Sequence, residues 1–271
     1  MGGGEYARTL TQPSDSKLYE VYSDAPKNDD QKFKTVTQAL EQWKTDIEKY
    51  KNDQDEKKKL QNIVIEIKDS GLYEEPLKIE LKKNQTLQIR AANKKRPVIR
   101  FSDRPDQFSI SGEAGSYFTL DGLLVAGHGM QVERTEEGES VAGIVIRHST
   151  LVPGWSLKSD CEPDQLEEPS IDITNANPCI TIEHSIVGSI QVNIDEVGLD
   201  PIQIRISDSI LDATGSDCDG PACEAIGAFG SSIAHALLTI VRSTVFGRID
   251  THAIELAENS IFMGTVRVAR R

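Results

Sequence analysis

Hydrophobic and polar residues alternate along most of the second part of the chain. Ile63, Ile65 and Ile67 occupy every second position, and Leu87 and Ile89 repeat the pattern. A period of two is typical of a β-strand, in which successive side chains point to opposite faces. Turn-forming residues separate these short runs, mostly without hairpin dipeptides, so tight antiparallel hairpins are not expected.

A longer unit recurs within this pattern. It reads hydrophobic, any, hydrophobic, any, any, Ser or Asn, any, hydrophobic, and its five copies have polar anchors at Ser149, Ser185, Ser209, Ser243 and Asn259. The anchors lie 36, 24, 34 and 16 residues apart. A constant unit with insertions of variable length is typical of a solenoid, in which each repeat is one coil and loops bulge from it.

The pattern therefore predicts an all-β fold, a right-handed parallel β-helix over residues 61–271. Each coil would stack on the next, burying columns of Ile, Leu and Val, while the Ser or Asn would bend the chain between two strands. A solenoid of this kind leaves strand edges open at both ends, and these must be covered.

The first part of the chain has a different period. From Val36 to Tyr50, hydrophobic residues three and four apart form one helical stripe that includes Trp43. We expect residues 32–60 to be a helix and linker that cap the β-helix. The polar, irregular residues 1–31 are expected to form a flexible or loosely docked arm.

Charge and composition narrow the function classes. The net charge of −13, without a basic stripe, argues against a nucleic-acid partner. The longest apolar run is too short to span a membrane. No signal-peptide pattern is visible at the N-terminus, so we expect synthesis in the cytoplasm. The acids gather in loop segments such as 157–170 and 212–234, where they could attract a cation or a basic partner.

The sequence resembles the pectate-lyase-like superfamily of right-handed β-helices over residues 61–271. Gly71, Tyr73 and Glu75 resemble the opening coil of pectinesterase-type helices. Residues 116–271 resemble uncharacterised bacterial β-helix proteins, relatives of which are often encoded near phage-tail-like contractile injection components. The resemblance implies a polysaccharide or protein partner, and a place in an exported or assembled particle.

The enzyme signatures of that superfamily are not matched. Gly127-His128-Gly129 resembles a polygalacturonase tripeptide, but the acid pairs that such hydrolases need are missing. Asp172 could join Asp195 and Arg205 in a calcium-dependent lyase site, as one of many possible triples. We interpret the His128 tripeptide as a turn, because its glycines permit unusual backbone angles.

Two loops supply the remaining candidate residues. Trp155, Asp160 and Asp164 lie on one acidic loop and are candidate contacts for a glycan or protein, although Trp155 could equally pack under its own loop. Asp212, Asp217 and Asp219 are candidate ligands for an irregular Ca²⁺ site, although the spacing fails the EF-hand pattern. No other cofactor is expected. His148 and His184 occupy equivalent repeat positions, directly before the Ser anchor. They are candidates for a series of metal ligands, and the alternative is an ordinary stack of polar residues on one face of the solenoid.

Three functions follow as hypotheses. The first is a non-catalytic structural or binding module, a rigid β-helix that presents acidic loops to a protein or glycan partner. The second is a polysaccharide lyase or glycoside hydrolase. The third is a structural protein that associates end to end through its C-terminal coil, where the chain from Thr265 to Arg271 has strand character.

Overall fold

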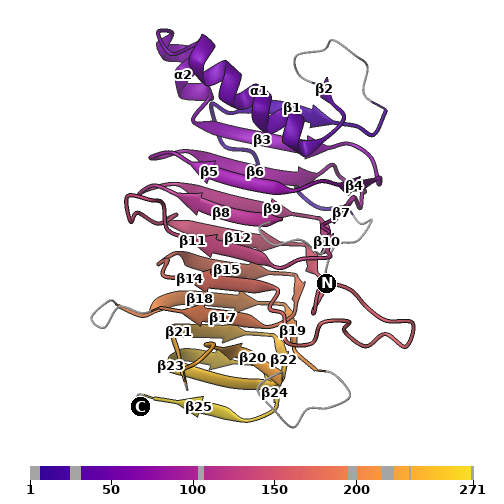
Figure 1. Ribbon diagram of the computed structural model, residues 1–271, viewed down its shortest axis with the longest axis vertical. Helices are drawn as coiled ribbons and strands as arrows, with labels where there is room; N and C mark the ends of the chain where they lie inside the picture. Colours follow the sequence, from indigo (N-terminus) through magenta and orange to yellow (C-terminus); the bar gives the residue numbers. More distant parts are fainter. Residues whose placement is uncertain are drawn as a thin grey trace.

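The computed structural model describes residues 7–24, 32–102, 107–194, 200–214, 223–231 and 233–269. Parallel strands stack in successive coils from one end of the molecule to the other, and two helices lie across the N-terminal end (Figure 1). The fold class predicted from the repeat is confirmed: the protein is an all-β parallel β-helix with an N-terminal capping α-helix.

From β3 onward, each coil contributes one strand to each of three columns, and β1 adds a further rung to the first column. The first column contains β1 (Lys17–Val21), β3 (Asn62–Ile67), β6 (Thr86–Ala91), β9 (Tyr117–Asp121), β12 (Gly143–Arg147), β15 (Cys179–Glu183), β18 (Ile202–Ser207), β21 (Ala234–Val241) and the end of β23 (Arg248–Glu258). The second contains β4 (Leu72–Glu74), β7 (Val98–Arg100), β10 (Leu124–Ala126), β13 (Thr150–Leu151), β16 (Ile186–Val187), β19 (Ile210–Asp212), β22 (Thr244–Phe246) and β24 (Ile261–Met263).

The third column contains β5 (Leu77–Leu81), β8 (Phe108–Gly112), β11 (Met130–Glu133), β14 (Ile171–Thr174), β17 (Ile190–Asn193), β20 (Glu224–Gly227), the start of β23 and β25 (Val266–Val268). Because β23 passes from the third column into the first, these two columns form one continuous sheet. Every strand pairing in the three columns is parallel, as expected when each coil stacks on the previous one.

The core consists of inward side chains in register along each column. In the first column the stack includes Leu87, Phe118, Ile144, Ile180 and Ile204, all buried. Alternation places the intervening polar residues outside, so the period of two in the sequence corresponds directly to the inner and outer faces.

A ladder of serine side chains forms the corner between the first and second columns. Ser149, Ser185, Ser209 and Ser243 are buried, and each hydroxyl donates to a carbonyl two residues earlier in its own coil, at 2.7–2.8 Å. The hydroxyl of Ser185 also accepts the backbone N–H of Ser149 at 3.2 Å, and the later coils repeat this contact. The predicted anchors are therefore the residues that turn the chain and join neighbouring coils.

The prediction of Asn259 as the fifth anchor is wrong by one residue. Ser260, not Asn259, continues the ladder and accepts the N–H of Ser243 at 3.2 Å. Asn259 takes the preceding left-handed position (φ 50°), which His148 and His184 occupy in earlier coils. The pairing of β21 with β23 shifts register, and this irregularity displaces the pattern in the sequence.

The N-terminal cap begins with α1 (Val36–Lys49), whose apolar stripe packs on the first coil, and continues into α2 (Gln54–Lys59). The buried Trp43 donates its indole N–H to the carbonyl of Leu60 at 2.9 Å. Glu75 accepts the free N–H groups of Val36 and Thr37 at 2.9 and 2.7 Å. The last residue of the Gly-x-Tyr-x-Glu segment thus fixes the helix N-terminus to the opening coil.

The described part of residues 1–31 is not loosely attached. β1 pairs with β3 on one side and with the short β2 (Lys32–Phe33) on the other, so both strands continue the first column beyond β3. Residues 7–16 run along the outside of this column, where Arg8 contacts Asp121 of β9 and the Thr11 carbonyl accepts a hydrogen bond from Arg90 of β6. The stack of parallel strands therefore begins before residue 61. The sequence pattern does not reveal this rung because the alternation in β1 is only five residues long.

Candidate binding site on the third column

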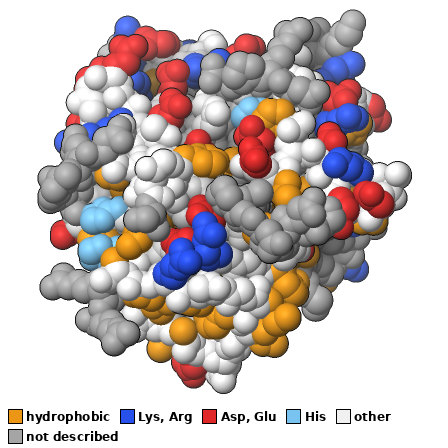
Figure 2. Space-filling model, turned by 60° about the horizontal axis from the view of Figure 1, so that its bottom comes forward, with side chains coloured by type: hydrophobic (Ala, Val, Ile, Leu, Met, Phe, Trp, Pro, Cys, Tyr) orange, Lys and Arg blue, Asp and Glu red, His pale blue; other side chains and the backbone are white. Residues whose placement is uncertain are grey.

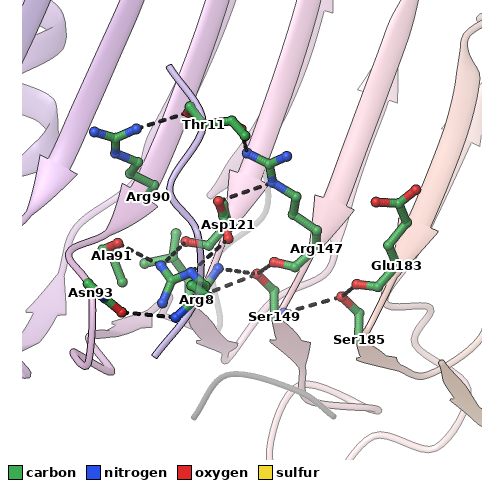
Figure 3. A network of polar contacts seen from close by, with 12 residues as sticks. Arg8, Thr11, Arg90, Ala91, Asn93, Asp121, Arg147, Ser149, Glu183 and Ser185 are labelled. Atoms are coloured by element: carbon green, nitrogen blue, oxygen red, sulfur yellow. Dashed lines mark hydrogen bonds and ion pairs between the residues drawn. The ribbon is translucent and has the colours of Figure 1, made fainter. Parts of the chain in front are cut away.

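The outer faces of the columns differ in what covers them. On the first column, Arg8 from the N-terminal segment is buried and its Nε lies 3.1 Å from a carboxylate oxygen of Asp121 (Figure 3). Arg147 contacts the other oxygen at 3.0 Å and also donates to the Thr11 hydroxyl, while Arg90 donates to the Thr11 carbonyl. These buried charges are paired with each other, so this cluster holds the segment in place.

Room for Arg8 comes from a glycine. Gly122 has φ 81° and occupies the left-handed corner position that side chains fill in later coils. A Cβ at Gly122 would collide with the guanidinium group of Arg8. The permissive residue therefore serves both the turn and the close approach of the N-terminal segment.

The outer face of the third column carries a row of polar side chains. Gln131 on β11, Asp172 on β14 and Gln191 on β17 lie opposite one another in the parallel register. Their neighbours in each strand point into the core, so alternation directs all three outward. Stacked strands lie about 4.8 Å apart, so the row is a closely spaced, rigid series of amide and carboxyl groups.

Two acceptors in this row have no hydrogen-bond partner among the residues that the structure describes. The Oε1 atoms of Gln131 and Gln191 are both shielded from solvent, and the residue Gln191 is only 3% exposed. A buried polar atom without a partner costs about 1–3 kcal/mol. Two such acceptors on one face, on either side of Asp172, therefore point to a ligand or water molecules that donate hydrogen bonds.

Asp172 lies between the two glutamines and is partly buried. Asn193 donates its side-chain N–H to the Asp172 carboxyl at 2.8 Å. Burial raises the pKa of Asp172 above its ordinary value, because it removes water from the charged form, and the hydrogen bonds from Asn193 and Thr174 only partly oppose this effect. Among the described residues, no cation contributes to lowering the pKa of Asp172. The carboxyl group therefore keeps its proton to a higher pH than an exposed aspartate would.

A hollow of about 260 Å³ adjoins the row at its C-terminal side. Gln191 and Glu224 line it from the strands, Leu166 and Glu167 from the loop between β13 and β14, and Phe229 from the turn after β20. Phe229 is 54% exposed, and its backbone N–H donates to the Asn193 side-chain oxygen at 2.7 Å. The contact ties an exposed aromatic ring to the polar row.

A second, more polar hollow of about 550 Å³ lies on the same outer face nearer the N-terminal end. Lys78, Glu80, Ser109 and Ser111 line it from β5 and β8, with Glu133 from β11. The third column therefore presents two hollows with the polar row between them, all on one line of stacked strands.

The loop candidates lie beside this face but are otherwise engaged. Trp155 stacks on His128 with ring centroids 4.8 Å apart, so its ring packs against the turn of 127–129, and its buried indole N–H has no partner among the described residues. Asp160 and Asp164 are exposed on the same loop, where Asp160 accepts the N–H of Glu162 and Asp164 accepts the Ser156 hydroxyl. The structure does not bring these three residues together into a pocket with the polar row.

The calcium candidates divide differently. Asp212 accepts both the N–H and the hydroxyl of Thr214, at 3.1 and 2.5 Å, within a local turn. Asp217 and Asp219 lie outside the described residues. Among the residues that the structure describes, no group of three or more His, Cys, Asp or Glu side chains is arranged to hold a metal ion.

The histidine pair of the repeat is a stack rather than part of such a group. His148 and His184 lie parallel with ring centroids 5.1 Å apart. Burial lowers the pKa of His148 below its ordinary value, and the neighbouring His184 adds to the shift. The Asp121 carboxylate opposes both effects but does not outweigh them, so the pKa of His148 stays below its ordinary value.

Sequence reasoning found Asp172 but not its neighbours Gln131, Gln191, Asn193 and Phe229. Each glutamine occupies an outward position of a short strand, so the alternation marked it as polar and external. What the sequence does not show is that β11 and β14 are adjacent in space, although β12, β13 and the loop of 152–170 lie between them in the chain. A search for polar residues at equivalent outward positions of successive coils would have found the row.

Compared with known protein families, curated proteins and solved structures, the chain matches none of them. Within the described ranges, none of the helices has the length and apolar character that crossing a membrane would require.

Proposed function

We propose that this protein is a non-catalytic binding module that holds a neutral glycan along the outer face of its third column. The observation that carries the proposal is the pair of buried, unpaired amide oxygens beside Asp172. Sugar hydroxyls are hydrogen-bond donors, so they can satisfy such acceptors, and the fixed strand spacing places the acceptors in a line. The superfamily resemblance, with its polysaccharide ligands, agrees with this chemistry.

The surroundings of the row favour a neutral ligand of some length. The net charge of −13 and the acids of the adjoining loop repel polyanions. Phe229 offers an exposed apolar face at one end, and a polar hollow lies at the other. A ligand that spans both would gain specificity from a few polar groups and affinity from the aromatic ring, as is usual for small-molecule sites.

The resemblance also supplies a setting for the proposal. In a phage-tail-like assembly, a rigid solenoid would present this face to a surface polysaccharide. A folded protein partner is the competing ligand, and it would be recognised through the acidic loops rather than through the polar row.

A glycan-binding screen followed by calorimetry tests the proposal. Gln191→Met removes an acceptor with little change in shape, and Phe229→Ala removes the ring. We expect each to weaken binding of a neutral oligosaccharide at least ten-fold, corresponding to about 1.4 kcal/mol. Leu157→Ala is the matched control, since Leu157 is a similarly exposed hydrophobic residue outside the hollow that contains Phe229. Failure of every neutral glycan to bind, or equal affinities for all three variants, would reject the proposal.

A glycoside hydrolase is the second candidate, favoured by the raised pKa of Asp172. A general acid must hold a proton near neutral pH, and burial moves Asp172 in that direction. Glu133 is two residues beyond Gln131, the residue opposite Asp172, so it lies on the same outward face of the adjacent strand. It would supply the second carboxyl group that glycoside hydrolases need. Release of reducing ends by the wild type, lost in Asp172→Asn while binding is retained, would replace the binding module with this enzyme.

A further inference from the structure

The hollow at the C-terminal side of the polar row differs in chemistry from the row itself. Glu224 and Glu167 line it with carboxyl groups, and Phe229 adds an aromatic ring to a residue that is 54% exposed. Among the described residues that line this hollow, none is Lys, Arg or His. The hollow therefore combines acidic groups with an aromatic face.

A glycine places one of these carboxyl groups next to the row. Gly227 lies opposite Gln191 in the parallel register of β17 and β20. A Cβ at Gly227 would collide with the Oε2 atom of Glu224, so the carboxylate occupies the space that a side chain would fill. A carboxylate oxygen is therefore held on the strand beside the buried amide of Gln191.

The positive charge near the hollow is shared with another acid. Arg248 contacts Glu224 through Nη2 and Asp250 through Nε. The exposed Arg267 approaches Asp250 only to 3.9 Å. Within the described ranges, Glu167 forms no ion pair. The two carboxyl groups of the hollow therefore have a single neighbouring cation, which a third carboxylate shares, and the remaining negative charge attracts a positive ligand.

A buried acceptor is a second, independent indication of a ligand. Gln191 lines the hollow and is only 3% exposed, and its Oε1 atom has no partner among the described residues. The amide oxygen and the carboxylates are all acceptors, so they need a ligand that donates hydrogen bonds. A protonated primary amine has three N–H donors and no acceptor, and a cation also binds to the face of an aromatic ring. Its chemistry therefore matches the acids, the amide oxygen and the ring together.

We propose that this hollow binds the protonated amine of an amino sugar. The proposal rests on the proposed function and refines it at one position: the glycan is neutral apart from one unit with a free amino group, which occupies the Phe229 end. Pockets for whole small molecules usually measure about 300–1,000 Å³. The hollow of about 260 Å³ therefore suits one sugar unit rather than a whole ligand.

The wider surface agrees with a ligand of this charge. The net charge of the chain is −13, and Figure 2 shows acidic side chains next to hydrophobic ones at several places on the surface of this end. A negative field raises the local concentration of cations. An acetylated amine has lost its charge and carries a carbonyl acceptor, which the carboxylates of the hollow would repel. The free amine should therefore be strongly preferred.

Calorimetry with two matched disaccharides tests the proposal. The first consists of two glucosamine units, and the second is the same disaccharide with both amines acetylated. At about pH 6, where the free amines are protonated, the wild type should bind the first at least ten-fold more tightly than the second. Cyclohexylamine, a ring of similar size without hydroxyl groups, should bind at least ten-fold more weakly than the glucosamine disaccharide.

Two substitutions locate the preference in the hollow. Glu167→Gln and Glu224→Gln should each remove most of the preference for the free amine, while the affinity for the acetylated form stays within about two-fold of that of the wild type. Glu168→Gln is the matched control, because Glu168 is next to Glu167 in the chain but does not line the hollow. Gln191→Met should weaken both disaccharides, since its acceptor serves either form.

The outcomes separate this proposal from the proposed function. Equal binding of the two disaccharides, or a preference that survives both glutamate substitutions, would overturn the amine site while leaving the neutral glycan site intact. Equal losses in Glu168→Gln and Glu167→Gln would show attraction to the general charge and would also overturn it. Cyclohexylamine binding as tightly as the glucosamine disaccharide would overturn the assignment to a sugar. Binding of the glucosamine disaccharide alone, with no neutral glycan bound, would reject the proposed function and keep the amine site.

Discussion

At the scale of single residues, burial decides which polar groups are structural and which are available. Arg8 and Arg147 each contact the Asp121 carboxylate, so this ion cluster stabilises the packing of the N-terminal segment. Gln191 and Gln131 are equally external in the strand pattern, yet their oxygens have no partner. The sequence alone shows the same alternation at both places.

Replacing Asp172 with Asn should make stability depend less on pH. Burial raises the pKa of Asp172 in the folded state above its unfolded value. The favourable contribution of the protonated form is complete below the unfolded pKa, about 3.9, and is lost as pH rises through the higher folded pKa. Asn stays neutral, so Asp172→Asn should be more stable than the wild type at pH 7, and this gain should disappear near pH 3.

Urea unfolding at the two pH values measures this difference. Asp160→Asn, an exposed change on the loop, should alter the free energy of unfolding by less than about 0.5 kcal/mol at either pH. Equal effects of the two substitutions at pH 7 would contradict a burial penalty at Asp172.

At the scale of the element, the serine ladder joins one coil to the next. The hydroxyl of Ser185 accepts the N–H of Ser149 and donates to the carbonyl of Glu183. No water reaches these groups, because both serines are fully buried. The corner therefore depends on a residue that is small, can turn the chain and carries both a donor and an acceptor.

Ser185→Ala should destabilise the protein by about 1–3 kcal/mol, because the buried N–H of Ser149 loses its side-chain acceptor. Ser260→Ala is the control at the open end of the ladder, where Ser260 is only partly buried and water can replace the hydroxyl. Chemical denaturation should show the larger loss for Ser185. Equal losses at both positions would show that burial of the ladder does not matter.

At the scale of the whole molecule, the capping helix determines how the N-terminal end of the solenoid is closed. Nearest-neighbour coils support each other along the stack, so an uncovered end weakens the coil behind it and exposes strand edges. The cap closes this end by burying Trp43 over the first coil.

Trp43→Ala should therefore have two effects. The loss of the buried ring should cost about 3–5 kcal/mol in unfolding experiments. It should also expose the edge of the first coil, so sedimentation should detect larger species than the wild type forms. Trp43→Phe keeps most of the buried ring, and it should lose less stability and form no larger species. Oligomers of unchanged size for Trp43→Ala would show that the cap does not prevent stacking.

The sequence by itself determined the coil, its corner and the capping helix. Alternation sets the inner and outer faces, a recurring Ser sets the turn, and a stripe from Val36 to Tyr50 sets the cap, because each depends on residues close together in the chain. The slip at Asn259 occurred where β23 is irregular, which no local pattern reveals.

Only the tertiary structure decided which outward residues meet. Gln131 and Asp172 belong to neighbouring strands although two other strands and a long loop lie between them in the chain, and loop length carries no information about stacking register. The docking of Arg8 against Asp121 likewise joins residues more than a hundred positions apart. The candidate site is a product of the stacking, in which strands distant in sequence are brought side by side.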